Sequence, residues 1–116
     1  MTVFPVVGIT YFMGDLLKSP EKVIVHGCNC FCVMGSGIAA QIRKQFPSAW
    51  LADQNTIPGD NYKLGRYTYA AEHDKLIFNA YTQYGTNLPV NVNYDALRNA
   101  LTRISQDLRT VGYDGP

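Results

Sequence analysis

Residues 25–42, VHGCNCFCVMGSGIAAQI, bring together most of the side chains in this sequence that could do chemistry. The segment holds all three cysteines of the chain, Cys28, Cys30 and Cys32, and one of its two histidines, His26. A glycine-rich turn follows them directly. The thiols could bind a metal ion or act as nucleophiles, whereas the glycines could let a ligand approach the backbone. The function of the segment depends on which use the spacing favours.

The spacing of the cysteines disfavours a metal site. Structural zinc sites pair cysteines separated by about two to four residues, usually with a second pair elsewhere. Cys28, Cys30 and Cys32 follow a C-x-C-x-C pattern, and the sequence has no second pair. On a strand, however, His26, Cys28 and Cys30 would share one face. We therefore expect no metal, and a small cysteine-rich metal or interaction domain remains the competing hypothesis.

A catalytic cysteine is also disfavoured. Such a thiol needs a base and an electropositive setting. His26 could be that base, but cysteines are among the most buried residues and behave as small apolar groups. The sequence favours packing as the role of Cys30 and Cys32, which flank Phe31.

The turn Gly35-Ser36-Gly37 explains more of the segment. It lies between an apolar run and a helical pattern. Glycine allows close approach of a ligand to the backbone, and a helix N-terminus offers unpaired N–H groups that bind phosphate. Ligands of open α/β sheets bind at the carboxyl ends of the strands. The unit predicts a nucleotide or phosphorylated-sugar site, with a plain tight turn as the alternative.

Apolar periodicity indicates the elements that position this turn. Strands are predicted at 6–13, 22–28, 65–71 and 75–82, with 22–28 central in the sheet and a hairpin between the last two. A helix is predicted from Gly37, broken at Pro47, with a second short helix from Ser48. A last helix is predicted between an Asn93 cap and a stop at Gly112. This order predicts an α/β fold.

The composition narrows the class of protein. The 116 residues suffice for one domain, and Lys+Arg 10 against Asp+Glu 9 leaves no basic surplus for direct binding of nucleic acid. No run approaches the about 18 apolar residues of a membrane span, and the N-terminus lacks the basic region of a signal peptide. The three cysteines are too close together to join distant parts of the fold. We therefore expect a cytoplasmic protein.

Several motifs together resemble the macrodomain family. They are Gly14-Asp15 after the first strand, VIVHGCN at 23–29, MGSGIAAQIRKQFP at 34–47, FNAYTQYG at 78–85 and VNYDALRNAL at 92–101. The sequence is most similar to the small single-domain branch with the yeast-type ADP-ribose-1″-phosphate phosphatases and related phage proteins. The resemblance implies a three-layer α/β/α sandwich with a mixed sheet and a cleft for ADP-ribose.

The resemblance also implies a set of ligand-binding residues. They are Asp15, Leu16, Asn29, Gly35, Ser36, Gly37, Ile38, Tyr81 and Gln83. Asp15 would accept a hydrogen bond from the adenine amino group, and Asn29 would contact the distal ribose. The amides of the glycine-rich turn would hold the diphosphate. There are alternatives: Asp15 could cap the turn after it, Asn29 could hold its own loop, and Tyr81 and Gln83 could be surface packing.

The catalytic residues implied by the resemblance are His26 and Asn29, because His26 matches a histidine proposed as catalytic in the phosphatase branch. Without the resemblance, His26 on an apolar strand would be a core histidine. The implied reaction is hydrolysis of the phosphate monoester of ADP-ribose 1″-phosphate, with no cofactor. A non-catalytic module that binds ADP-ribose or an ADP-ribosylated protein, and an ADP-ribosyl hydrolase acting on modified macromolecules, are the alternatives.

Two departures from the family pattern affect these expectations. Related glycohydrolases form a covalent intermediate through a lysine soon after the strand that corresponds to 75–82, where this sequence has Thr82-Gln83. The family also continues with a strand and a second glycine-rich loop, whereas this sequence ends at Pro116. We therefore expect a single macrodomain, 1–116, incomplete at its C-terminus, and a homodimer through an exposed sheet edge is a hypothesis.

Overall fold

The computed structural model describes residues 22–35, 37–86 and 92–112. Its elements, in chain order, are β1 (Val23–Cys28), α1 (Gly37–Gln45), α2 (Pro47–Gln54), the 3₁₀ helix η2 (Asn61–Lys63), β2 (Tyr67–Glu72), β3 (Lys75–Tyr81) and α3 (Tyr94–Thr110). The strand predicted at 6–13 and the site residues Asp15, Leu16 and Ser36 lie outside the described residues. No helix in the described ranges is both long enough and apolar enough to cross a membrane.

The described strands form a mixed sheet in the order β1-β3-β2. β1 runs parallel to β3, which places His26 opposite Asn79 and Cys28 opposite Tyr81. β2 and β3 form the predicted antiparallel hairpin, through a turn in which His73 and Asp74 have φ values of 52° and 63°. Among these strands β3 lies between the other two. The predicted central position of 22–28 stays a prediction, because the strand predicted at 6–13 lies outside the described residues.

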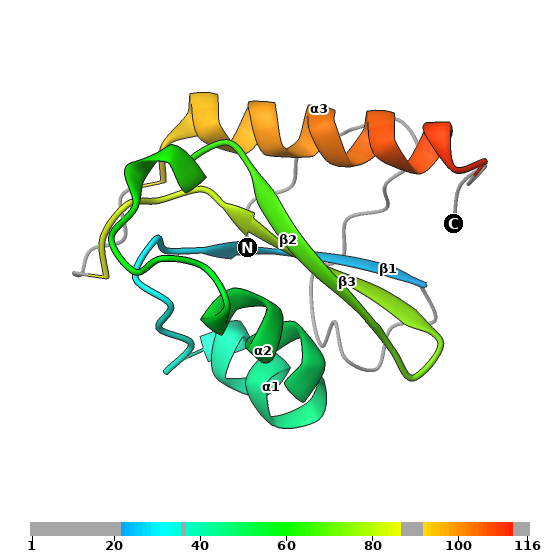
Figure 1. The fold of residues 1–116 in the computed structure, drawn as a ribbon, viewed down its shortest axis with the longest axis horizontal. Coiled ribbons are helices and arrows are strands. Elements are labelled where there is room, and N and C mark those ends of the chain that lie inside the picture. The colour runs from blue at the N-terminus through cyan, green and yellow to red at the C-terminus, as the bar shows by residue number, and fades with distance from the viewer. Residues whose placement is uncertain (1–21, 36, 87–91, 113–116) are drawn as a thin grey trace.

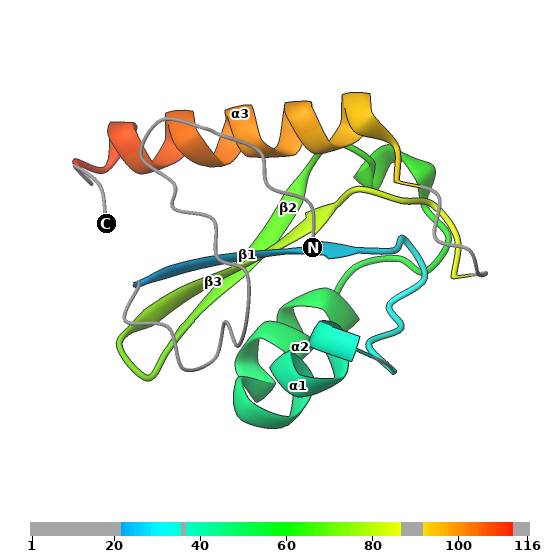
Figure 2. The same cartoon turned by 180° about the vertical axis from the view of Figure 1, so that it is seen from behind.

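Helices cover both faces of the sheet (Figures 1 and 2). The face towards α1 and α2 carries a core that includes Ile24, Ile42 and Ile77. The opposite face packs Phe78 and other apolar residues against α3. The two cores arise because successive strand residues point to opposite faces. The predicted α/β/α layering is confirmed.

Local signals set the helix boundaries. α1 ends at Gln45 and α2 begins at Pro47. Proline fits this first helical position because an N–H there would have no partner within the helix. The N-terminus of α2 is capped from β2, because the Glu72 carboxylate accepts from the Ser48 amide at 3.0 Å. Asn93 caps α3 through a 2.9 Å bond from the Ala96 amide. Gly112, with φ of 84°, follows the end of α3 as predicted.

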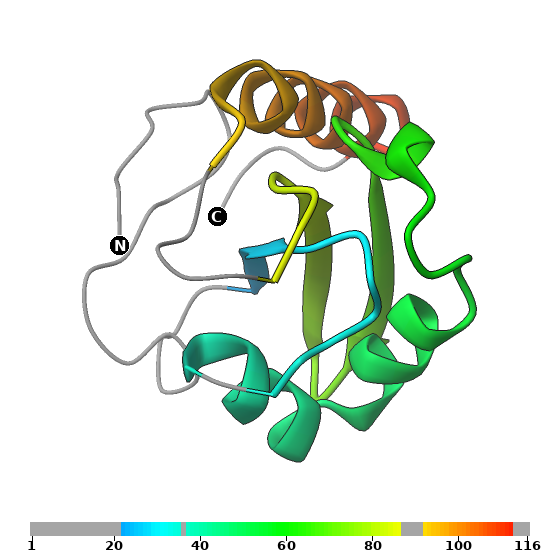
Figure 3. The same cartoon turned by 90° about the vertical axis from the view of Figure 1, so that its left-hand side faces the viewer.

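Three connections meet at the carboxyl ends of β1 and β3, the end that faces the viewer in Figure 3. They are residues 29–35, the turn at 57–60 and residues 82–86. The Cys30 amide donates to the Tyr84 carbonyl at 3.0 Å, and the Gly59 amide donates to the Cys30 carbonyl at 2.7 Å. These bonds tie the cysteine-containing loop to both neighbours and fix its direction into α1.

Candidate functional site

Asn29 shapes the loop that follows β1. Its side-chain oxygen accepts from the Phe31 amide at 2.9 Å and the Val33 amide at 3.4 Å, and its Nδ2 donates to the Val33 carbonyl at 2.9 Å. This is the alternative in which Asn29 holds its own loop. The predicted contact with a ribose stays a prediction, and it would have to coexist with these bonds.

The start of α1 presents hydrogen-bond donors. Within the described residues, the backbone N–H groups of Gly37, Ile38 and Ala39 donate no hydrogen bond. The first turn of α1 carries no acidic side chain, unlike the Glu72-capped start of α2. A β-carbon added at Gly37 would meet no described atom within 4 Å. Among the described residues, nothing caps the partial positive charge of this helix end.

Gly37 and Ile38 adopt the two roles that the turn needs. Gly37 has φ of +60°, a left-handed value that costs little without a side chain. Ile38 sends its partly buried side chain into the core on the α1 side, which anchors the helix while its amide stays at the surface. Gly35, exposed in the loop, completes the described part of the predicted turn.

His26 lies in the core rather than at the surface, with 6% of the residue exposed. Its Nε2 is 2.6 Å from Asn79 Oδ1, while Asn79 Nδ2 donates to the Ala49 carbonyl at 2.9 Å and to Thr68 Oγ1 at 3.0 Å. Asn79 therefore presents its oxygen to His26, so Nε2 carries the proton. Burial lowers the pKa of His26 to about 4, against the opposing effect of the bond to Asn79. The ring is neutral at pH 7, and its catalytic role stays a prediction.

Tyr81 also points inward. The residue is 1% exposed, and its hydroxyl donates to Asp53 Oδ1 at 2.7 Å. The Tyr81 hydroxyl oxygen also lies 3.0 Å from Thr68 Oγ1. Burial raises the pKa of Tyr81 far above its usual value. The described geometry gives no support to its predicted ligand contact. Gln83 is half-buried after β3, with Nε2 3.5 Å from the Gly85 carbonyl, and its ligand contact is likewise still a prediction.

A buried polar cluster under the loop was missed by the sequence reasoning. It consists of Cys32, Asp53, Thr56, Lys63 and Tyr81. Lys63 is 7% exposed, and its Nζ donates to Thr56 Oγ1 at 2.8 Å and lies 5.2 Å from the centre of the Tyr81 ring. Burial raises the pKa of Asp53, against the Tyr81 hydrogen bond and the Lys63 charge. No local pattern around Lys63 in GDNYKLG marks it as buried.

The described side chains contain no group of three or more His, Cys, Asp or Glu residues that could hold a metal ion. All three cysteines are free thiols.

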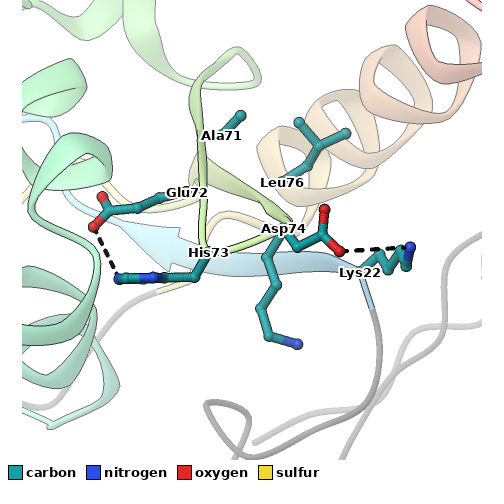
Figure 4. Close-up of a pocket in the computed structure, with 7 residues that line it drawn as sticks. Lys22, Ala71, Glu72, His73, Asp74 and Leu76 are labelled. Atoms are coloured by element: carbon teal, nitrogen blue, oxygen red, sulfur yellow. Dashed lines mark ion pairs between the residues drawn. The ribbon is translucent and has the colours of Figure 1, made fainter.

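A hollow at the other end of the sheet is lined by the β2–β3 turn (Figure 4). Four of its lining residues form two ion pairs, Lys22 with Asp74 at 3.9 Å and His73 with Glu72 at 3.4 Å. In both pairs at least one side chain is largely exposed, and such pairs contribute little to the stability of a protein. The hollow lies at the amino end of β3, away from the open start of α1, and is not part of the candidate site.

The layered fold defines an α/β sandwich domain in which α1 begins after the first of two parallel strands. The macrodomain of Mycobacterium tuberculosis DarG has this fold, with a TM-score of 0.67 and 24% identity over 88% of this chain and 68% of that one. A Thermosipho africanus DarTG structure in complex with ADP-ribose gives a TM-score of 0.70 at 18% identity, over 88% of this chain and 30% of the other. The chain has the macrodomain fold.

Sequence comparison gives relatives with different names. An uncharacterized 17.5 kDa protein of the tk-vs intergenic region of Enterobacteria phage T4 is 40% identical over 105 residues, which are 84% of this chain and 66% of the relative. A DNA ADP-ribosyl glycohydrolase of Mycobacterium tuberculosis is 30% identical over 86% of this chain and 30% of its own length. An ADP-ribose 1″-phosphate phosphatase of Scheffersomyces stipitis is 48% identical, but over only 36% of this chain and 28% of its own length. No protein-family profile matches the chain.

The chain thus spans just under two thirds of the phage relative and less than a third of the two named enzymes. The two enzyme names agree on a hydrolase that acts on an ADP-ribose compound, and they differ in the bond that is cleaved.

Proposed function

We propose that this protein binds ADP-ribose and holds the diphosphate at the start of α1. The observation that carries the proposal is the row of amides at Gly37, Ile38 and Ala39, which have no acceptor within the described residues. Helix N-termini of this kind bind phosphate through N–H donors and the helix dipole. The related structure with ADP-ribose bound supports the identity of the ligand. Asp15, which lies outside the described residues, would accept a hydrogen bond from the adenine amino group.

For the reaction, we propose hydrolysis of ADP-ribose 1″-phosphate to ADP-ribose and inorganic phosphate. Water attacks the phosphorus atom, the bond between phosphorus and the ribose oxygen breaks, and that oxygen takes up a proton. Amides near the reacting group would stabilise the charge that develops in the transition state. Asn29 would contribute by holding the loop, as its bonds to Phe31 and Val33 suggest. Proton transfer by His26 would require release of its bond to Asn79.

A second candidate reaction is removal of ADP-ribose from a modified macromolecule. The specific observation in its favour is coverage: the relatives named DNA ADP-ribosyl glycohydrolase align over 86% of this chain, against 36% for the phosphatase. Residues 82–86, TQYGT, contain no lysine to attack the sugar, so water would have to do so directly. A module that binds ADP-ribose without chemistry is the remaining alternative.

One set of measurements separates these functions. Calorimetric titration with ADP-ribose should give a micromolar dissociation constant, about −8 kcal/mol. Incubation with ADP-ribose 1″-phosphate should then release phosphate, while incubation with an ADP-ribosylated oligonucleotide should release no ADP-ribose. The reverse pattern would favour the glycohydrolase, and binding without either product would leave a binding module. Absence of ADP-ribose binding would contradict the proposal altogether.

A further inference from the structure

The three cysteines, which the proposed function does not use, have different surroundings. Cys28 and Cys30 are 4% and 0% exposed, and burial raises the pKa of both thiols. Cys28 lies 3.6 Å from the neutral His26 ring, and Cys30 donates to the Gln83 carbonyl at 3.6 Å. Buried, protonated thiols are inert towards oxidants. Cys32 differs because it is partly exposed.

A buried cation faces the Cys32 sulfur. Lys63 Nζ lies 3.6 Å from Cys32 Sγ, and the lysine is 7% exposed. Among the described residues, no carboxylate lies within ion-pair distance of Nζ, and the nearby Asp53 carboxylate accepts from Tyr81 instead. A buried ammonium group without a partner carboxylate is costly. The ammonium group is therefore placed to stabilise the negative charge that develops on the Cys32 sulfur when it reacts.

We propose that Cys32 is a site of reversible oxidation by hydroperoxides, with Lys63 as the residue that activates it. The Cys32 thiolate attacks one oxygen of the peroxide, so that an S–O bond forms as the O–O bond breaks. Two electrons pass from sulfur to the peroxide. The leaving hydroxide or alkoxide takes a proton, for which the Lys63 ammonium group is the adjacent donor. The products are Cys32 sulfenic acid and water or an alcohol, and Lys63 regains its proton from solvent. A thiol reductant restores Cys32.

The oxidised sulfur would disturb the loop that leads to α1. Cys32 Sγ already lies 3.3 Å from the Asp53 carbonyl and 3.2 Å from Thr56 Oγ1, and the Cys32 carbonyl accepts from Gln54 Nε2 at 2.7 Å. An added oxygen lengthens the side chain inside these contacts and displaces the loop from the end of α2. This consequence rests on the proposed function: oxidation misaligns the amides at the start of α1 and so weakens binding of ADP-ribose.

Peroxide treatment of the full chain with a sulfenic-acid trap such as dimedone, followed by peptide mass spectrometry, tests the site. We expect the adduct on Cys32, with Cys28 and Cys30 in the same sample as unlabelled internal controls. Lys63→Met should slow labelling of Cys32 by about tenfold or more, because it removes the cation that faces the sulfur. The exposed lysine on α1 gives the matched control, Lys44→Met, which should label at the wild-type rate.

Equal labelling of all three cysteines in the folded wild type, or an unchanged rate in a folded Lys63→Met, would overturn the proposal. Circular dichroism monitors folding of the variants. If Lys63→Met does not fold, Lys63→Arg keeps the charge and should retain selective labelling of Cys32; loss of that selectivity in folded Lys63→Arg would also contradict the proposal.

Titration with ADP-ribose before and after oxidation then tests the consequence. We expect weaker binding after oxidation, no such change in peroxide-treated Cys32→Ser, and recovery with dithiothreitol. If reduced protein does not bind ADP-ribose, the proposed function fails while the labelling result stands. If reduced and oxidised protein bind equally, the proposed effect on the loop is wrong.

Discussion

His26 Nε2 lies 2.6 Å from Asn79 Oδ1, directly across the parallel pairing of β1 and β3. The bond joins two strands, and Asn79 extends it to α2 through the Ala49 carbonyl and to β2 through Thr68. A histidine that the family resemblance marks as catalytic thus holds four elements of the fold together. Its structural and chemical roles can be separated by experiment.

Removal of the His26 ring should destabilise the protein. His26→Ala leaves the Asn79 oxygen buried without a donor, so the free energy of unfolding should fall by about 1–3 kcal/mol. His26→Gln can place an N–H close to the position of Nε2 and should recover most of the loss. Urea denaturation measures both. A folded Gln variant that binds ADP-ribose but releases no phosphate from ADP-ribose 1″-phosphate would favour proton transfer by His26, and normal release would exclude it.

Stability should fall in mild acid because of His26. The pKa of His26 is about 4 in the folded state against 6.5 for a free histidine, so the unfolded chain binds a proton in this interval and the folded chain does not. The contribution is therefore complete above pH 6.5 and is lost as the pH falls towards 4, with a slope of up to about 1.4 kcal/mol per pH unit. The raised pKa of Asp53 acts in the opposite sense. The difference between wild type and His26→Gln isolates the histidine, and parallel curves would refute its assignment.

A negative charge at Gly37 should weaken binding of the diphosphate. Asp and Asn both tolerate the left-handed backbone found there, so Gly37→Asp and Gly37→Asn differ mainly in charge. We expect the Asp variant to bind ADP-ribose at least about tenfold more weakly than the Asn variant, because the carboxylate competes for the amides of α1. Isothermal titration measures the ratio. Equal affinities in the two variants would place the diphosphate elsewhere.

Loss of the Tyr81 hydroxyl should affect stability more than binding. Tyr81→Phe removes the donor to the buried Asp53, which should cost about 1–3 kcal/mol in the free energy of unfolding. Tyr84→Phe is the control, because that hydroxyl donates to the Gly59 carbonyl from an exposed ring and should cost less. A Tyr81→Phe variant with wild-type stability and weakened ADP-ribose binding would restore the predicted ligand contact.

Asp15 should determine the preference for adenine. Asp15→Ala should weaken ADP-ribose binding about tenfold or more, since a hydrogen bond to a charged acceptor contributes about 1.5–3 kcal/mol. The hypoxanthine analogue of ADP-ribose has no amino group, so wild type should bind it more weakly and Asp15→Ala should bind both ligands alike. If Asp15→Ala still binds ADP-ribose more tightly than the hypoxanthine analogue, other residues recognise the adenine.

The sequence predicted the features that depend on neighbouring residues. Pro47 divided two helices, Asn93 capped the last one, and the alternation on either side of His73-Asp74 gave the hairpin, because each signal lies within a few residues of its effect. The order β1-β3-β2 was not predicted, because an apolar run indicates that a strand is buried but not which strands lie beside it.

Contacts between distant residues account for what was missed at the candidate site. Lys63 is buried against Cys32, 31 positions away, and Tyr81 binds Asp53, 28 positions away. In both pairs, the sequence around one residue gives no indication of the other. The open helix start was predicted because glycines, helix periodicity and the preceding strand lie together in one segment. The roles of individual side chains were harder to predict, because His26 and Tyr81 turn towards the interior.

The parallel pairing of β1 with β3 also sets an order of assembly. The β2–β3 hairpin closes across a turn of adjacent residues, whereas His26 meets Asn79 across 53 positions. Long-range closure is slow because chain entropy is lost before the contact forms. During synthesis, the strand pair beneath the 29–35 loop therefore cannot form until β3 has left the ribosome.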